Sequence, residues 1–289
     1  MNIILTGIPR SGTTLSCALL NQLPDVLALV EPMDITLLLA QTDATARREY
    51  MTQYFSSVRC DLLNKGKVAT NIVAEQGTNT FSDSRSDGGS GSGISTGKRK
   101  ASLIKRGTIS RDKHYGKDFR LVIKHPNAFS ALLPELSSAF TCFAIIRNPL
   151  SILASWHSLD HPLSRGHAPM AEAFDAVLQS QLDAESDDLN RQLILLDWFY
   201  RQYHEFLAAD HIIRYEDVVK SSGRALQCIE PSAKNLQQSL SSKNSSSLYD
   251  SVFMSEAAAR LRLNTSHGAW LYYRPAELEE IIQQSGRKQ

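Results

Sequence analysis

The sequence predicts an α/β protein with three layers, in which helices flank a central, mostly parallel β-sheet on both faces. Two observations carry this prediction. Short, unbroken apolar runs alternate with longer amphipathic segments along most of the chain, and the first run passes through a glycine-containing turn into a helical pattern. Strands that alternate with helices are typical of parallel sheets with right-handed connections. We therefore expect a single domain over residues 1–289.

The predicted strands are short apolar runs, as expected for parallel strands that are buried on both faces. The first two lie at residues 2–6 and 26–30. Three more are predicted at 119–124, 140–146 and 212–214. Glu31 directly follows the second predicted strand, and Lys124 is the last residue of the third.

Helices are predicted between the strands from apolar residues spaced three and four apart. The helix after the first strand spans 13–23 and ends before Pro24. The clearest helix, 188–208, has one apolar face that should pack on the core: Leu189, Leu193, Leu196, Tyr200, Tyr203 and Leu207. The remaining helices are predicted at 44–63, 127–136, 149–159 and 170–183.

Two segments interrupt this alternation. Residues 77–118 are rich in Ser, Gly and Thr and contain nine Lys or Arg against four Asp. Without apolar periodicity, and too long for an ordinary loop, this segment is predicted to be a flexible basic insertion or a lid. A serine-rich connector at 239–247 precedes a short helical region at the C-terminal end.

The overall composition excludes several classes of partner. Lys and Arg number 31 against 30 Asp and Glu, so no net field favours nucleic acid or an anionic membrane. The four cysteines lack the paired spacing of zinc or redox motifs, which predicts reduced thiols and no bound metal. There is no basic leader and no run of roughly 18 apolar residues. We therefore expect a cytoplasmic protein without a membrane span.

The turn after the first strand, Gly7-Ile-Pro-Arg-Ser-Gly-Thr-Thr14, has the composition of a phosphate-binding loop. Glycines allow backbone N–H groups to converge on an anion, and the helix that follows adds a favourable dipole. A nucleoside triphosphatase would have Lys after the second glycine, but here Thr13 follows Gly12 and the cation is Arg10. The loop therefore predicts an anion site without an obvious metal ligand. A turn that only joins strand to helix is the alternative.

Pro-Arg-Ser-Gly-Thr-Thr after an N-terminal strand resembles the 5′-phosphosulfate loop of sulfotransferases that use 3′-phosphoadenosine-5′-phosphosulfate (PAPS). The resemblance implies a P-loop-type fold and extends in order from residue 3 to about 219, ending at Arg214-Tyr-Glu-Asp-Val218. Residues 124–156 also resemble an uncharacterised bacterial branch. The loop residues implied to bind the donor are Arg10, Ser11, Gly12, Thr13 and Thr14.

A second signature of that family is an Arg at a strand end with a Ser eight residues later on the next helix. Arg147 and Ser155 fit this pattern, and Pro149 suits the first helical turn between them. The resemblance implies that both residues contact the 3′-phosphate of PAPS. Without it, Arg147 could be an ion-pair partner and Ser155 a surface hydroxyl.

Sulfuryl transfer needs a cation at the leaving oxygen and a base at the acceptor. Lys124 ends the third strand, where it resembles the catalytic lysine of several branches; a solvent-facing strand terminator is the alternative. Glu31 and His125 are candidates for the base. His125 directly follows Lys124 and should point to the opposite face while the strand continues. We therefore favour Glu31, although pairing with Arg10 would also explain it.

These observations predict PAPS-dependent sulfotransfer to a hydroxyl or amine of a small-molecule or carbohydrate acceptor, with 3′,5′-adenosine bisphosphate as product. A P-loop nucleotide kinase and a non-catalytic nucleotide-binding module are the alternatives. The sequence indicates neither the acceptor nor the oligomeric state. The roles of four C-terminal residues stay open: Arg260, Arg262, His267 and Trp270.

Overall fold

The computed structural model describes residues 1–72, 81–85, 98–101, 105–110 and 113–286. Its centre is a five-stranded sheet in the order β2-β7-β1-β8-β9, in which every neighbouring pair is parallel. The predicted α/β class and the five predicted strands are confirmed. The strands are β1 (Asn2–Gly7), β2 (Val26–Val30), β7 (Arg120–Lys124), β8 (Thr141–Ile146) and β9 (Ile212–Arg214).

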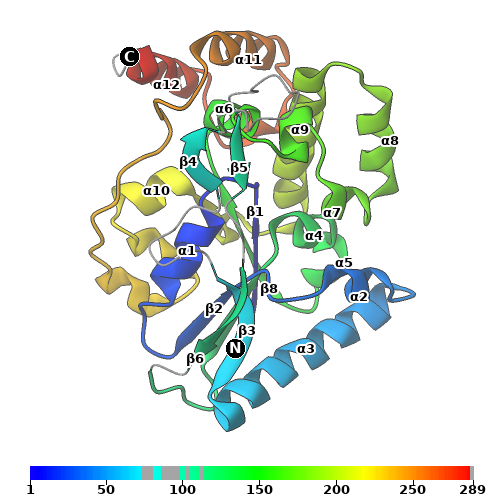
Figure 1. Ribbon diagram of the computed structural model, residues 1–289, viewed down its shortest axis with the longest axis vertical. Helices are drawn as coiled ribbons and strands as arrows, with labels where there is room; N and C mark the ends of the chain where they lie inside the picture. The colour runs from blue at the N-terminus through cyan, green and yellow to red at the C-terminus, as the bar shows by residue number, and fades with distance from the viewer. Residues whose placement is uncertain (73–80, 86–97, 102–104, 111–112, 287–289) are drawn as a thin grey trace, which may run out of the picture.

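The sheet separates two apolar cores, because successive side chains of a strand point to opposite faces. Ile4 and Ile123 belong to one core, and their neighbours Ile3 and Val122 belong to the other. Helices α1 and α10 lie on one side of the sheet, and α3, α4 and α9 lie on the other (Figure 1). This arrangement gives the three layers.

The helices fall close to the predicted segments, but two predictions merge helices that the chain separates. Residues 127–136 form α4 and α5, because Pro134 lies in the first turn of α5. Residues 170–183 form α7 and α8, because Asp175 caps α8 by accepting the N–H of Leu178. The helices are α1 (Thr13–Leu20), α2 (Ile35–Leu39), α3 (Ala44–Lys65), α4 (Pro126–Ala131), α5 (Leu133–Leu136), α6 (Pro149–His157), α7 (Pro169–Glu172), α8 (Ala176–Ala184), α9 (Asp188–Phe206), α10 (Tyr215–Lys220), α11 (Ser251–Leu263) and α12 (Ala276–Gly286).

Four strands that the sequence did not predict lie within or just before the insertion at 77–118. β3 (Lys67–Ile72) pairs with β6 (Lys105–Ser110), and β4 (Phe81–Arg85) pairs with β5 (Arg99–Ala101), both antiparallel. Their sequences are mostly polar, and backbone hydrogen bonds join them without a long apolar alternation. β4, β5 and β6 lie within the predicted flexible basic insertion or lid at 77–118, and its flexibility or closure stays a prediction. For 77–80, 86–97, 102–104 and 111–112 the prediction lies outside the described residues.

Within the described ranges, no helix combines the length and apolar character that crossing a membrane requires. The cytoplasmic location stays a prediction. All four cysteines are free thiols.

Candidate functional site

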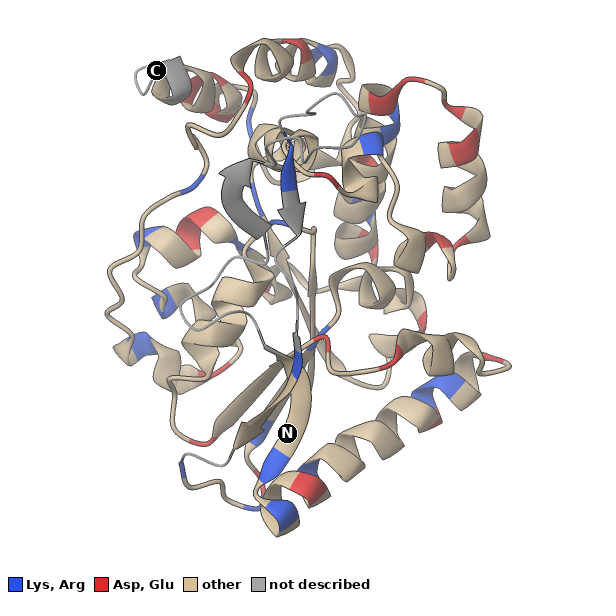
Figure 2. Ribbon diagram, viewed as in Figure 1, with Lys and Arg blue, Asp and Glu red and all other residues tan. Residues whose placement is uncertain are grey.

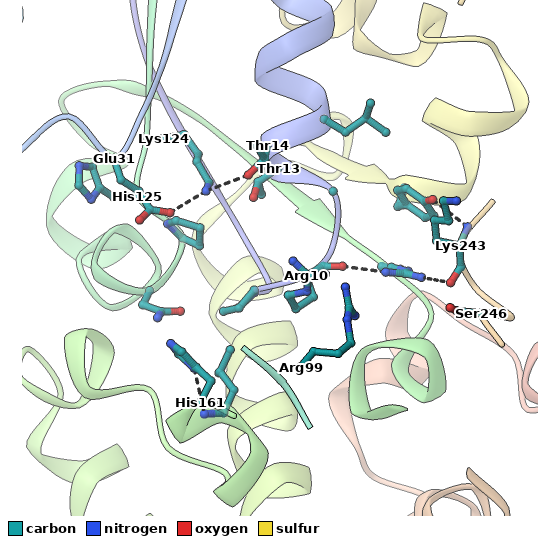
Figure 3. A pocket seen from close by; sticks show the side chains of 18 of the residues that line it. Arg10, Thr13, Thr14, Glu31, Arg99, Lys124, His125, His161, Lys243 and Ser246 are labelled. Atoms are coloured by element: carbon teal, nitrogen blue, oxygen red, sulfur yellow. Dashed lines mark hydrogen bonds and ion pairs between the residues drawn. The ribbon is translucent and has the colours of Figure 1, made fainter. Parts of the chain in front are cut away.

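A cavity of about 570 Å³ opens at the carboxyl ends of the central strands (Figure 3). This edge is where open α/β sheets hold their ligands, and the volume suits one small-molecule site. The loop between β1 and α1 lies at its centre, with Glu31 directly after β2 and Lys124 at the end of β7 on one side. Arg147 and Tyr215 follow β8 and β9 on the other side.

The geometry of the β1–α1 loop requires its two glycines. Gly7 has a φ of 149°, and a Cβ there would lie 2.5 Å from the carbonyl oxygen of Ile145. Gly12 caps α1 with a φ of 97°, and a Cβ there would lie 2.7 Å from the Tyr215 ring. The loop therefore fits tightly against β8 and α10 while the first N–H groups of α1 remain at the cavity, where they favour an anion.

The predicted loop residues divide between two roles. Arg10, Gly12, Thr13 and Thr14 line the cavity. Ser11 is fully buried, and its hydroxyl donates to the Ile145 carbonyl at 2.7 Å, so its side chain anchors the loop.

Arg10 connects the loop to the second predicted signature. Its φ of 76° is in the left-handed region, which is uncommon for a residue with a side chain. Its Nε donates to Ser155 Oγ at 3.2 Å. Ser155 is 1% exposed and does not line the cavity, so the structure places it against Arg10.

Glu31 and Lys124 form an ion pair in the cavity, with 2.7 Å between Oε1 and Nζ. The Lys124 Nζ also lies 3.4 Å from the Thr14 hydroxyl, and the Glu31 N–H donates to the Lys124 carbonyl at 2.8 Å. Burial would raise the pKa of Glu31, but Lys124 more than offsets this and the pKa is lowered. Glu31 is therefore ionised, as a proton acceptor must be.

His125 follows the last residue of β7 and caps α4, so the strand ends before it and strand alternation does not decide its direction. Its Nε2 accepts the N–H of Met33 at 3.2 Å, and its ring packs on Phe129. Burial lowers the pKa of His125 to about 3. Because its basic nitrogen is already used, His125 supports the corner after β2 and is a poor candidate for the base.

Arg147 links the β1–α1 loop to the serine-rich connector. Its Nη1 donates to the Arg10 carbonyl at 2.9 Å, its Nε to Asn244 Oδ1 at 2.8 Å and its Nη2 to the Lys243 carbonyl at 2.6 Å. The guanidinium also lies over the Tyr215 ring, 4.7 Å from its centre. None of the ion pairs within the described ranges includes Arg147. This buried cation is held by neutral acceptors.

The structure adds lining residues that the sequence analysis did not single out: Arg99, His161, Lys243 and Tyr249. Arg99 belongs to β5 and is 4% exposed. Its N–H donates to the Ser158 carbonyl, and its carbonyl accepts from Asp160, both at 2.8 Å. These bonds dock the insertion beside the end of α6. The basic run 98–100 was a signal for this region, but it did not identify which residue enters the cavity.

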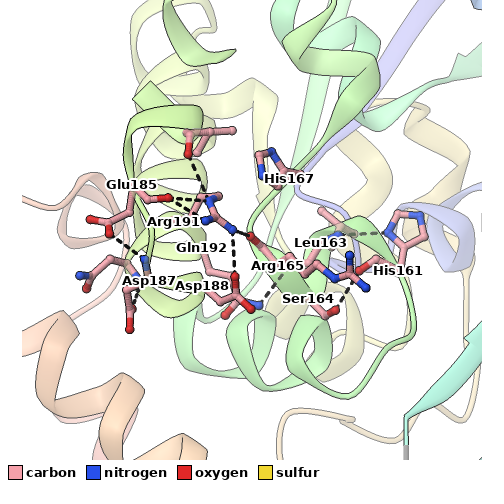
Figure 4. Close-up of polar contacts among 12 residues, drawn as sticks. His161, Leu163, Ser164, Arg165, His167, Glu185, Asp187, Asp188, Arg191 and Gln192 are labelled. Carbon is pink, nitrogen blue, oxygen red and sulfur yellow. Dashed lines mark hydrogen bonds and ion pairs between the residues drawn. The ribbon is translucent and has the colours of Figure 1, made fainter. Parts of the chain in front are cut away.

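His161 begins the short helix η1 (Pro162–Arg165), and its Nδ1 accepts the Leu163 N–H at 3.3 Å. Burial and the Arg10 charge lower the pKa of His161. Figure 4 shows how α9 holds this helix: Arg191 donates to the Arg165 carbonyl at 2.6 Å and Gln192 to the Leu163 carbonyl at 3.0 Å.

The four C-terminal residues with open roles do not line this cavity. Arg260 pairs with Asp187 and Glu256, and Arg262 pairs with Glu279. His267 caps a short helix, and the Trp270 indole donates to the Asn264 carbonyl at 2.8 Å. Their contacts stabilise the packing of the C-terminal region.

The electrostatic character of the cavity differs from that of the outer surface. Figure 2 shows basic and acidic residues interspersed over the outer helices. In contrast, the described cavity lining contains five Lys or Arg and a single carboxylate, Glu31. No cluster of His, Cys, Asp and Glu among the described residues could hold a metal ion. The cavity is therefore suited to a ligand with several negative charges.

Comparison with known protein families and with curated proteins finds no match for this chain. The interpretation of the site therefore depends on its geometry and on the sequence motifs.

Proposed function

We propose that the protein is a sulfotransferase that transfers a sulfuryl group from PAPS to a hydroxyl or amine, leaving 3′,5′-adenosine bisphosphate. The observation that carries this proposal is the Lys124–Glu31 pair, which lies beside a cationic β1–α1 loop that has no lysine after Gly12. Sulfuryl transfer requires a cation at the leaving oxygen and a base at the acceptor, and Lys124 and Glu31 supply one group of each kind in the cavity.

Each part of the site has a role in this reaction. The N–H groups that begin α1, together with Arg10, bind the 5′-phosphosulfate, and Arg147 favours the 3′-phosphate. The acceptor oxygen or nitrogen forms a bond to sulfur while the bond from sulfur to the leaving phosphate oxygen breaks. Lys124 neutralises the charge that develops on the leaving oxygen, and Glu31 takes the acceptor's proton.

The residues that line the cavity disfavour the kinase alternative. Thr13 occupies the position where a kinase loop carries lysine, and Glu31 is the only carboxylate in the described lining. It is already paired with Lys124. Magnesium-dependent phosphoryl transfer would need oxygen ligands for the metal as well as that lysine.

The proposal is tested by thermal-shift titration with 3′,5′-adenosine bisphosphate, 5′-AMP and Mg-ADP, followed by an assay of PAPS turnover. A ligand at 100 times its Kd stabilises the fold by about 2.7 kcal/mol. Because the bisphosphate should bind most tightly, it should raise Tm more than 5′-AMP or Mg-ADP does at the same concentration. Stabilisation by Mg-ADP alone would support a kinase. Binding without PAPS turnover over a broad acceptor panel would support a non-catalytic module.

Arg147→Ala provides the corresponding test of the 3′-phosphate site. Loss of a charge-assisted contact should weaken bisphosphate binding by about 1.5–3 kcal/mol and leave 5′-AMP much less affected. Asn244→Ala is the matched control, because it removes the acceptor of Arg147 Nε but keeps the guanidinium. If Arg147→Ala weakened the binding of both nucleotides equally, Arg147 would not bind the 3′-phosphate and would only support the connector.

A further inference from the structure

We infer that the acceptor is an uncharged hydroxyl compound with an apolar body, and that it binds in the half of the cavity built on β2 and β7. The inference rests on the proposed function for the reaction itself. It concerns the class of acceptor that fits the cavity. Neither the sequence motifs nor the Lys124–Glu31 pair specifies that class.

The order of the strands divides the cavity into two halves. Because β1 is central, its loop lies between the ends of β2 and β7 on one side and the ends of β8 and β9 on the other. In Figure 3, Glu31 and His125 lie at one end and Lys243 and Ser246 at the other, with Arg10 and Arg99 between them. The half with Glu31 is therefore the acceptor half.

The two halves differ in charge. Arg147 and Lys243 line the β8–β9 half, as expected for the anionic nucleotide. In the acceptor half, Lys124 is the only Lys or Arg among the described lining residues, and it is paired with Glu31. His125 is buried and neutral, since its pKa is about 3. An acceptor with its own charge would find no unpaired partner among these residues.

Five apolar residues line the acceptor half, beside the polar side chains of Asn127 and His161 (Figure 3). The apolar residues come from α2, α4, η1 and α7: Ile35, Pro126, Ala128, Leu163 and Met170. Met170 is 47% exposed and forms the rim, whereas Leu163 and Ala128 are buried. A sugar would place several hydroxyls against these side chains without hydrogen-bond partners, whereas an apolar body would be buried favourably.

One polar group in this half lacks a partner. Asn127 lines the same half, but its side-chain oxygen is buried away from solvent and accepts no hydrogen bond from the described residues. Buried polar groups in native proteins are nearly always paired. A ligand group in the cavity could reach this oxygen only after the Asn127 side chain turns, so the hydroxyl of the acceptor is inferred from the reaction and from the absence of charge partners among the described lining residues, not from Asn127.

The test measures binding to the protein saturated with 3′,5′-adenosine bisphosphate, by isothermal titration calorimetry. The probes are 2-naphthol, glucose and glucuronate. We expect 2-naphthol to bind at least about tenfold more tightly than either sugar. Met170→Glu should weaken naphthol binding by about tenfold, because it places a carboxylate at the apolar rim, and should leave the bisphosphate Kd unchanged.

Val177→Glu is the matched control, because Val177 is an exposed apolar residue of α8 that does not line the cavity. Equal effects of the two substitutions, or a sugar that binds as tightly as naphthol, would overturn the inference. So would a protein that binds the bisphosphate but no alcohol, and the proposed function would then survive. If the bisphosphate does not bind but naphthol binds in a Met170-dependent way, the inferred ligand class is supported and the proposed sulfotransferase function is contradicted.

Discussion

Arg10 and Glu31 share an uncommon backbone conformation. Both have side chains, yet their φ values are 76° and 48°, in the region that favours glycine. Such residues cost about 1–3 kcal/mol each and concentrate at functional sites. Both follow the carboxyl end of a sheet strand and line the cavity. The backbone at these two positions therefore directs one cation and one carboxylate toward the same ligand.

Glu31→Gln tests the role of the carboxylate. If Glu31 is the base, the substitution should reduce turnover by about 10²- to 10⁴-fold while the affinity for 3′,5′-adenosine bisphosphate is kept. Steady-state kinetics and calorimetry measure the two quantities. Slow hydrolysis of PAPS by water is the first assay until an acceptor is known. Wild-type turnover in Glu31→Gln, with loss in His125→Gln, would assign the base to His125.

His125 should make the stability of the fold depend on pH. Its pKa is lowered from 6.5 to about 3 by burial, so unfolding lets it take up a proton at intermediate pH. Stability should therefore fall as the pH falls below about 6.5. Between pH 7 and pH 5 this one group contributes a loss of about 2 kcal/mol.

Urea unfolding of wild type and His125→Gln at both pH values measures this contribution. The glutamine oxygen can still accept the Met33 N–H, and the variant should lose less stability on acidification. His204→Gln, at an exposed position of α9, is the control. An identical pH dependence in wild type and His125→Gln would show that the imidazole does not titrate as its burial requires.

At the scale of elements, β5 is the described part of the insertion that lines the cavity. Its Arg99 is joined through the backbone to the corner between α6 and η1. Arg99→Ala should weaken bisphosphate binding by about tenfold, since the buried guanidinium lies among the cations of the cavity. Lys98→Ala is the matched control, because Lys98 reaches Ser164 and does not line the cavity. Equal affinities of the two variants, by calorimetry, would exclude Arg99 from the anion site.

The sequence predicted the elements of the sheet better than the elements around it. The strands at 26–30 and 212–214 agree with the structure because buried parallel strands are continuous apolar runs. The breaks at Pro134 and Asp175 were missed because the apolar spacing continues through them. The strands β3 and β6 were missed because the alternation in β3 is short and because their pairing depends on a partner about forty residues away in sequence.

At the scale of the whole molecule, the site residues that the sequence predicted are those at the carboxyl ends of the parallel strands. Glu31 and Lys124 end neighbouring strands, and the structure joins them at 2.7 Å. Arg99 could not be predicted, because it enters the cavity through an inserted strand that docks beside α6, and His161 could not, because it begins a short helix that α9 holds. The connector after 239 was expected to be a simple link, yet Asn244 is buried against Arg147.

The central place of β1 also has a consequence for synthesis. β1 is translated before both of its neighbours, β7 and β8, and Ile3 pairs with Val122 on one side and Thr141 on the other. Its apolar residues therefore leave the ribosome long before either neighbour exists. Such long-range pairing folds slowly and leaves hydrophobic segments open to aggregation. Chains that end before Arg214 lack β9 and cannot complete the five-stranded sheet, so the full sheet should form only after that strand has been synthesised.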